Sequence, residues 1–120
     1  MLDSTHGSVL IVHGPEYVEA LRGFPPEHPL RPLRGEVAVG LMRAYGLLQE
    51  PTVVLRPPRL ATLAELERVH APDYVARVQE LSVLAAARGT GIELQDRAYG
   101  LILPDNPVFP GMHEAAATLA

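Results

Sequence analysis

The sequence predicts an α/β fold with a central parallel sheet. Two short runs of apolar, mostly β-branched residues, 9–12 and 52–55, alternate with segments whose apolar residues recur at helical spacing. This alternation is typical of α/β layers, in which a helical crossover connects parallel strands. Two strands are fewer than such a sheet needs, so we expect the sheet to be incomplete.

The first strand is Val9-Leu10-Ile11-Val12, an apolar run between Gly7 and Gly14-Pro15 that suits burial on both faces. The segment from Gly23 to Pro32 is rich in proline and predicts a loop of fixed shape. A helix follows, ending near Gly46, and its apolar positions are Leu33, Val37, Leu41, Ala44 and Leu48. Because its two internal glycines cost about 1 kcal/mol each, we expect packing against the sheet to stabilise this helix.

The second strand covers residues 52–55 and is closed by Pro57-Pro58. Thr62 and Glu65 have the spacing of a capping box, which predicts a short helix reaching about Val69. Pro72 opens a further helix that we expect to cover a sheet. The apolar face of that helix is Tyr74, Val78, Leu81 and Ala85, and Gly89 lies beyond its end.

Residues 89–103 have weak periodicity and predict a loop with a short extended piece near 99–102. From Pro110 a last helix is expected, with Met112, Ala115, Ala116 and Leu119 on one face. No stop signal precedes Ala120, so we expect this helix to be cut in mid-course. Residues 1–120 would then be the N-terminal portion of a larger domain.

The amino-acid composition argues against several classes of partner and of site chemistry. The 120 residues are 48% hydrophobic and 20% charged, as in soluble globular proteins. A formal net charge of −4 offers no attraction for nucleic acid or anionic lipid, so we expect neither as a partner. The absence of cysteine excludes disulfides, thiolate nucleophiles and Cys-type zinc sites, and is compatible with the cytoplasm, the expected location.

Taken alone, the polar motifs indicate no catalytic centre. The five histidines show neither the i, i+4 pair of a helical zinc motif nor a carboxylate at metal-ligand spacing. Phosphate-binding glycine loops and the Gly-x-Ser-x-Gly elbow are also missing from the sequence. We therefore predict no catalytic residue and no metal ligand in this chain.

Three stretches taken in order carry a family resemblance. They are His28-Pro29-Leu30-Arg31-Pro32-Leu33-Arg34 with the following Leu41-to-Leu47 helix end, Val69-His70-Ala71-Pro72-Asp73-Tyr74-Val75, and Asp105-Asn106-Pro107-Val108-Phe109-Pro110-Gly111-Met112. Together they resemble the opening of histone deacetylases and bacterial acetoin-utilisation deacetylases. The resemblance covers essentially the whole chain, but only the first part of the family's catalytic domain.

The resemblance implies the N-terminal part of an arginase/deacetylase-like fold. It also implies hydrolysis of acetyl-lysine, or of another small acylated amine, by a zinc-activated water. In the family the zinc ligands and the catalytic histidines and tyrosine follow the segment represented here. We therefore expect no cofactor in this chain, zinc in the full-length protein, and no activity from the chain alone.

Two positions match functional residues of the family. Asp105 matches the rim aspartate that accepts hydrogen bonds from substrate backbone amides, although aspartate is also favoured there as a turn residue. Arg34 matches the arginine that lines the product channel, although it could equally face solvent in a first helical turn. His28 and His70 lie in matched motifs, and we expect them to fix loop shape and cap helix ends.

The sequence departs from the family pattern at Gly35-Glu36 and at Leu103-Pro104, which leaves the loop conformation and the substrate class open. Two other hypotheses also remain open. The chain could be a non-catalytic binding or assembly module that completes its sheet with a partner chain, or with the missing C-terminal portion. It could also be a small unrelated α/β domain in which the three motifs coincide by chance.

Overall fold

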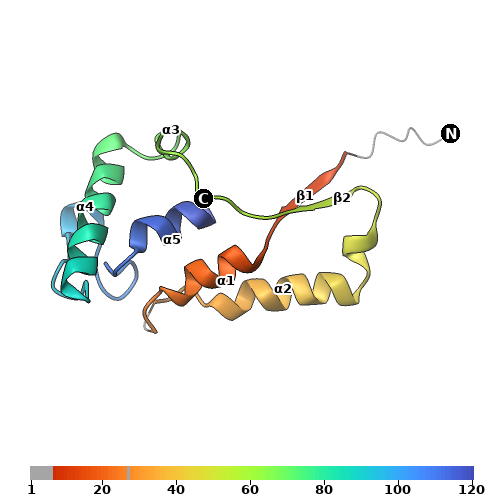
Figure 1. Ribbon diagram of the computed structural model, residues 1–120, viewed down its shortest axis with the longest axis horizontal. Helices are drawn as coiled ribbons and strands as arrows, with labels where there is room; N and C mark the ends of the chain where they lie inside the picture. The colour runs from red at the N-terminus through yellow and green to blue at the C-terminus, as the bar shows by residue number, and fades with distance from the viewer. Residues whose placement is uncertain (1–6, 27) are drawn as a thin grey trace.

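Two short parallel strands form the sheet of this protein (Figure 1). The structure is a computed structural model that describes residues 7–26 and 28–120. Strand β1 (Val9–Val12) pairs with β2 (Val53–Arg56), with Val9 opposite Val53 and Val12 opposite Arg56. A parallel pair cannot be joined by a tight turn, and here the crossover contains two helices. The predicted α/β architecture with a parallel sheet is confirmed.

The sheet is more exposed than the sequence indicated. Val9 is 53% exposed and Leu10 61%, so the prediction of a strand buried on both faces is wrong. Burial on both faces requires a layer of helices on each side and neighbouring strands at each edge. Within the described residues the sheet has only β1 and β2, and its side chains are intermediate or exposed.

Helix α1 (Pro15–Arg22) was not among the predicted elements. Its sequence does hold the signals of a helix, because Pro15 occupies the first turn, Glu16 follows it, and Arg22 lies in the last turn before Gly23. The prediction treats Gly14-Pro15 only as the end of a strand, and the helix that starts at Pro15 is therefore missing from it. The helix packs against the C-terminal helix of the chain and so joins the two halves of the molecule (Figure 1).

Helix α2 (Pro32–Ala44) confirms the predicted helix. It ends at Tyr45 and the left-handed Gly46, and Leu48 falls in a following 3₁₀ turn, η1 (Leu47–Gln49). The expected packing against a sheet is wrong for this chain: among its described side chains, Val39 alone is buried. The exposed apolar side chains of α2 include Leu33, Val37 and Leu41.

The capping box is present at helix α3 (Leu63–Leu66), which is shorter than predicted. Glu65 N donates to Thr62 Oγ1 at 3.3 Å, and Thr62 N donates back to Glu65 Oε2 at 2.8 Å. The chain then runs through a turn from Glu67 to Val69 before the next helix.

Helix α4 (Pro72–Arg88) has the predicted bounds, with Pro72 in its first turn and the left-handed Gly89 at its end. Contrary to the prediction, it covers no sheet formed by the described residues. Its buried face packs against helix α5 (Met112–Leu119) and the segment that joins them, which contains a 3₁₀ turn, η2 (Arg97–Tyr99). The core formed there consists of Val78, Leu81, Ala85, Leu101, Val108, Phe109, Met112 and Ala115.

Helix α5 begins at Met112, two residues after the predicted start at Pro110, and its buried face differs from the prediction. Met112 and Ala115 are buried, whereas Ala116 is exposed and Ala117 is buried. The reason is that α5 has neighbours on several sides, α1, α4 and residue Ala61, whose N–H donates to the Ala117 carbonyl at 2.8 Å.

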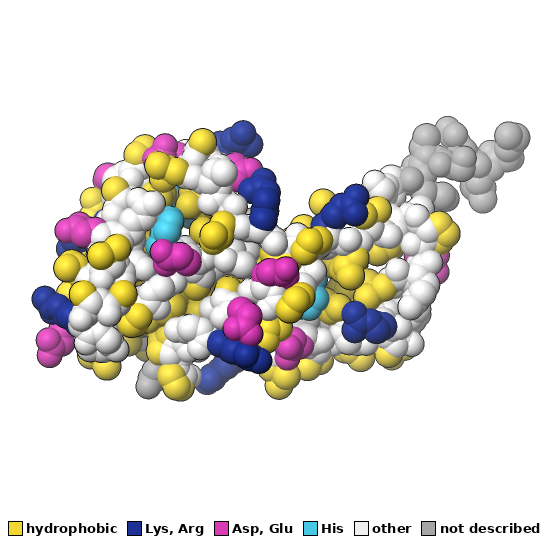
Figure 2. Space-filling model, viewed as in Figure 1, with side chains coloured by type: hydrophobic (Ala, Val, Ile, Leu, Met, Phe, Trp, Pro, Cys, Tyr) yellow, Lys and Arg dark blue, Asp and Glu magenta, His cyan; other side chains and the backbone are white. Residues whose placement is uncertain are grey.

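The molecule is elongated, with principal extents of 61 × 29 × 20 Å. Its radius of gyration is 17.5 Å, whereas a compact domain of this length has about 14 Å. The well-packed core lies in the α4–α5 half, and the β1–β2–α2 half extends away from it (Figure 1). Hydrophobic side chains remain on the surface over both halves (Figure 2). No helix in the described part of the chain is long and apolar enough to cross a membrane.

Candidate functional site

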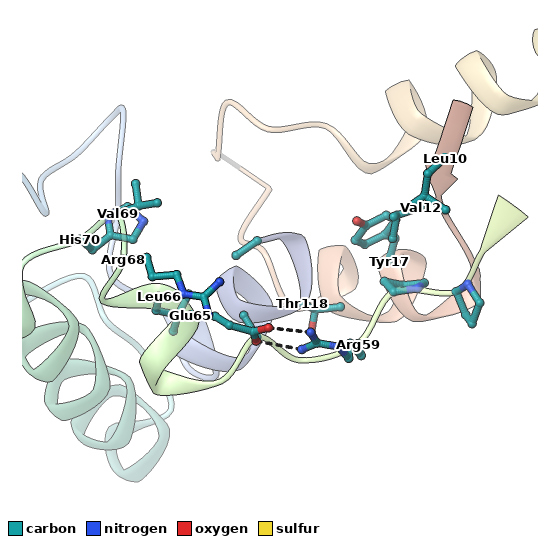
Figure 3. A pocket seen from close by; sticks show the side chains of 14 residues that line it. Leu10, Val12, Tyr17, Arg59, Glu65, Leu66, Arg68, Val69, His70 and Thr118 are labelled. Atoms are coloured by element: carbon teal, nitrogen blue, oxygen red, sulfur yellow. Dashed lines mark hydrogen bonds and ion pairs between the residues drawn. The ribbon is translucent and has the colours of Figure 1, made fainter. Parts of the chain in front are cut away.

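An open cleft of about 680 Å³ lies at the carboxyl end of the parallel strands. In open parallel sheets, ligands bind outside the carboxyl ends of the strands, so this is the edge where a site is expected. Figure 3 shows Leu10, Val12 and Tyr17 toward one end of the cleft, and Val69 and His70 toward the other. Its apolar lining comes from both halves of the molecule.

The polar wall of this cleft is an ion pair between Arg59 and Glu65. Arg59 donates to both carboxylate oxygens of Glu65, at 2.9 and 2.6 Å, and the N–H and hydroxyl of Thr62 add two further bonds. These bonds, that from Arg59 foremost, hold the pKa of Glu65 well below its usual range. Because its acceptor sites are occupied, Glu65 is placed to stabilise the start of α3 and not to transfer protons.

Asp105 lies on the surface in a turn that the N–H of Asn106 closes by donating to the Ile102 carbonyl at 2.9 Å. A purely turn-forming aspartate would accept a backbone N–H with its own carboxylate. Within residues 7–26 and 28–120, no such bond to Asp105 is found. The side chain of Asp105 is exposed, and its role in substrate binding stays a prediction.

Arg34 lies in the first turn of α2 and is exposed to solvent. Its backbone N–H donates to the Arg31 carbonyl at 3.2 Å. The product-channel role of Arg34 stays a prediction. Neither Arg34 nor Asp105 lines the cleft at the strand ends.

The segments that carry these two residues are joined by aromatic contacts. Phe24, in the proline-rich loop before α2, packs with its ring centroid 4.8 Å from that of Phe109, four residues after Asp105. Phe109 is 4% exposed and belongs to the core, and Phe24 packs against that core. No sequence pattern indicates this contact, because Phe24 and Phe109 are 85 positions apart in the chain.

The histidines have structural surroundings. His28 accepts the N–H of Leu30 with Nδ1 at 3.0 Å, which confirms its predicted role in loop shape. The prediction that His28 and His70 cap helix ends is wrong, because no side-chain hydrogen bond caps the N-terminus of α2 or of α4. Instead the His70 ring lies 5.6 Å from that of Tyr74. Among the described residues, no group of three or more His, Cys, Asp or Glu could hold a metal ion.

One polar cluster brings Ser82, His113 and Glu114 together between α4 and α5, and sequence reasoning missed it. Ser82 Oγ accepts the His113 N–H at 3.2 Å and donates to Glu114 Oε2 at 3.4 Å. Gly111, at the start of α5, has no side chain with which to cap the helix, so Ser82 supplies the missing acceptor from the neighbouring helix. The hydroxyl is thus committed to a backbone bond, and the cluster is a helix cap and not a nucleophile.

The parallel strands, their helical crossover and the cleft at their carboxyl ends define an incomplete α/β domain. The family model of the histone deacetylase domain matches residues 28–120. The chain therefore belongs to the histone deacetylase family, and the predicted membership and fold class are confirmed.

The relatives agree with this assignment. An acetoin utilization protein AcuC from Bacillus subtilis is 34% identical over 110 residues, which are 92% of this chain and 26% of the relative. An AcuC from Staphylococcus aureus is 31% identical over 96 residues, or 80% and 23%. Histone deacetylase 8 from Xenopus tropicalis is 29% identical over 108 residues, or 90% and 27%. The chain thus spans about a quarter of the length of these relatives. No solved structure matches it.

Proposed function

We propose that this chain forms the N-terminal part of a cytoplasmic, zinc-dependent amidohydrolase that removes acetyl groups from acetyl-lysine or other acetylated amines. The observation that carries the proposal is the match of the histone deacetylase domain over residues 28–120, which includes all three motifs described above. The relative from Xenopus tropicalis is named a histone deacetylase, which favours amide hydrolysis over another use of the fold.

The described residues do not fit a zinc ion by themselves, since they hold no group of three or more ligating side chains. We propose that its ligands come from polypeptide other than residues 1–120, and that this chain alone does not hydrolyse acetylated amines.

Within that enzyme, Asp105 would hold the substrate. Its exposed carboxylate can accept hydrogen bonds from two backbone amides of a peptide, and charge-assisted bonds contribute about 1.5–3 kcal/mol each. Arg34 would bind the carboxylate product, because the guanidinium fork matches a carboxylate in two parallel hydrogen bonds.

The test is a chimera in which this chain replaces the matching quarter of the Bacillus subtilis relative. We expect the chimera, supplied with zinc, to deacetylate an acetyl-lysine peptide, and the 120-residue chain to give no turnover. Asp105→Ala should lower kcat/KM by about 100-fold or more, because it removes both charge-assisted bonds of the carboxylate. Glu93→Ala, which removes another exposed loop carboxylate, is the matched control.

Arg34→Ala should slow turnover while Arg43→Ala, an exposed arginine on the same helix, leaves it unchanged. Arg34→Lys should restore turnover only in part, because lysine keeps the charge and loses the bidentate geometry. A folded chimera without deacetylase activity would contradict the proposed function. Chelator-sensitive hydrolysis by the 120-residue chain would contradict the proposal that its metal ligands lie elsewhere.

A second candidate is a non-catalytic assembly module that completes its sheet with a partner chain. It is favoured by the accessible surface of 8300 Å², against about 6,300 Å² for a folded monomer of this mass. The excess on this one chain is more than the area of about 800 Å² that each partner buries in a standard interface. Sedimentation of the chain as purified from its source distinguishes the candidates: a stable oligomer or a stoichiometric co-purifying protein supports the module, and a monomer without a co-purifying protein contradicts it.

A further inference from the structure

Three rings meet between the proline-rich loop and the segment that follows Asp105. The His28 ring lies edge-on to Phe24 with centroids 4.5 Å apart, and edge-on to Phe109 at 5.9 Å. Phe24 and Phe109 complete the cluster at 4.8 Å. His28 is half-buried in this cluster. Edge-to-face arrangements at these separations are favourable, so the three rings form a specific contact.

The same imidazole also shapes its own loop. Its Nδ1 accepts the Leu30 N–H at 3.0 Å, and its backbone N–H donates to the Pro25 carbonyl at 2.9 Å. The acceptor role requires a neutral ring with its hydrogen on Nε2. Partial burial lowers the pKa of His28 below the ordinary 6.5, which favours this neutral form.

The contact between His28 and Phe109 joins two segments, and each segment carries a residue with a role in the proposed function. Arg34 follows the loop in the first turn of α2, and Asp105 stands four residues before Phe109. Phe109 itself is fixed in the core, and the Val108 peptide next to it lies against Gly91. The loop, by contrast, is held by short-range bonds such as that from Arg31 Nη1 to the Pro26 carbonyl at 2.9 Å.

We propose that His28 is a positioning residue: its ring ties the proline-rich loop to Phe109 and thereby sets the Asp105 segment relative to the start of α2. This inference rests on the proposed function for the roles of Asp105 and Arg34, but the contact itself is independent of them. It explains why an imidazole suits this position, since a single ring supplies both an aromatic edge and a hydrogen-bond acceptor.

Two substitutions separate these two properties. His28→Asn keeps an acceptor for the Leu30 N–H and removes the ring, whereas His28→Phe keeps a ring and removes the acceptor. The first readout is amide hydrogen exchange in the 120-residue chain, measured at Leu30 and at Asn106, whose N–H bonds the Ile102 carbonyl in the Asp105 turn.

We expect His28→Asn to retain protection at Leu30 and to speed exchange at Asn106 by about fivefold, the equivalent of one aromatic pair. His28→Phe should speed exchange at Leu30 and leave exchange at Asn106 unchanged, because it removes the acceptor and keeps the ring. In a Phe109→Leu background, His28→Asn should no longer change exchange at Asn106, because the ring contact is already lost. Unchanged exchange at Asn106 in every variant would overturn the proposal, as would random-coil ring shifts for His28 in the unsubstituted chain.

The second readout is activity of the chimera with the Bacillus relative. His28→Asn should raise KM for the acetylated peptide about fivefold with kcat within about twofold, because a displaced Asp105 weakens substrate binding, and His28→Phe should restore KM. Equal loss of kcat in both variants would indicate a merely structural role. If the chimera is inactive, the proposed function fails, while hydrogen exchange still decides on the contact.

Discussion

Substituting Gly91 by alanine should destabilise the protein strongly. Gly91 is buried, and a Cβ at this position would overlap the carbonyl group of Val108 and lie 2.8 Å from the Phe109 nitrogen. Real Cβ contacts essentially never fall under 3.0 Å, and the atoms in question are backbone, which cannot swing aside. Overpacking of this kind costs about 1–3 kcal/mol, and a rigid backbone neighbour places it toward the upper end. The lost contact would also displace the segment that follows Asp105.

The matched control is Gly35→Ala, for which no atom lies within 4 Å of the added Cβ. Gly35 is exposed within α2, so alanine should stabilise the chain by about 0.5–1 kcal/mol through helix propensity. Urea unfolding of both variants gives the free energies, and a loss of 3 kcal/mol would lower Tm by about 12 °C. If Gly91→Ala were as stable as Gly35→Ala, the close approach between Gly91 and Val108 would not exist.

Three further predictions concern stability. Thr62→Ala should cost about 1 kcal/mol in urea unfolding and Thr62→Ser almost nothing, because serine keeps the hydroxyl that caps α3. Leu81→Ala should cost about 3–5 kcal/mol, since Leu81 is 2% exposed, whereas Val83→Ala on the exposed face should change little. The pKa of His28 is lower in the folded chain than the 6.5 of an unfolded chain, so at a pH between these two pKa values the unfolded chain binds more protons. The free energy of unfolding should therefore fall as the pH drops below about 6.5. His28→Phe should flatten this pH dependence, and an equal slope in both proteins would contradict the prediction.

Features that depend on near neighbours in the chain could be predicted from the sequence. The capping box needs only Thr62 and Glu65, and the end of α4 needs only Gly89, which takes the left-handed conformation that glycine permits. The parallel pairing of the two strands also followed from local patterns, because a long crossover between strands allows little else.

Features that depend on distant partners could not be predicted in this way. The apolar pattern of α2 correctly indicated a helix, but apolar residues show that a face can be buried and not what covers it. In this chain nothing described covers Val37, which is 51% exposed. The α5 face was misassigned for the opposite reason, since contacts on several sides bury Ala117 outside the simple stripe.

The candidate site also combines features that depend on near neighbours in the chain with features that depend on distant partners. Asp105 and Arg34 could be singled out only by resemblance to a family, because an aspartate in a turn and an arginine in a first helical turn are ordinary on their own. The contact of His28 with Phe109 joins residues at opposite ends of the chain, and no sequence pattern specifies such a pairing. The structure therefore adds the relation between the two segments, which the motifs alone do not contain.

The Asp105 segment and the Arg34 segment lie in halves of the molecule that are packed unequally. Asp105 belongs to the half with the buried core, while Arg34 begins a helix whose described side chains are almost all exposed. A two-stranded sheet without a cover is marginal in water, so β1, β2 and α2 gain little stability from one another. The packing of α1 on α5 and the aromatic contacts at Phe109 then connect this weaker half to the core. A polypeptide that covered the sheet would add contacts to the β1–β2–α2 half while the core around Phe109 is already packed, so the aromatic contacts at Phe109 are the place where such a polypeptide would act on the Asp105 segment.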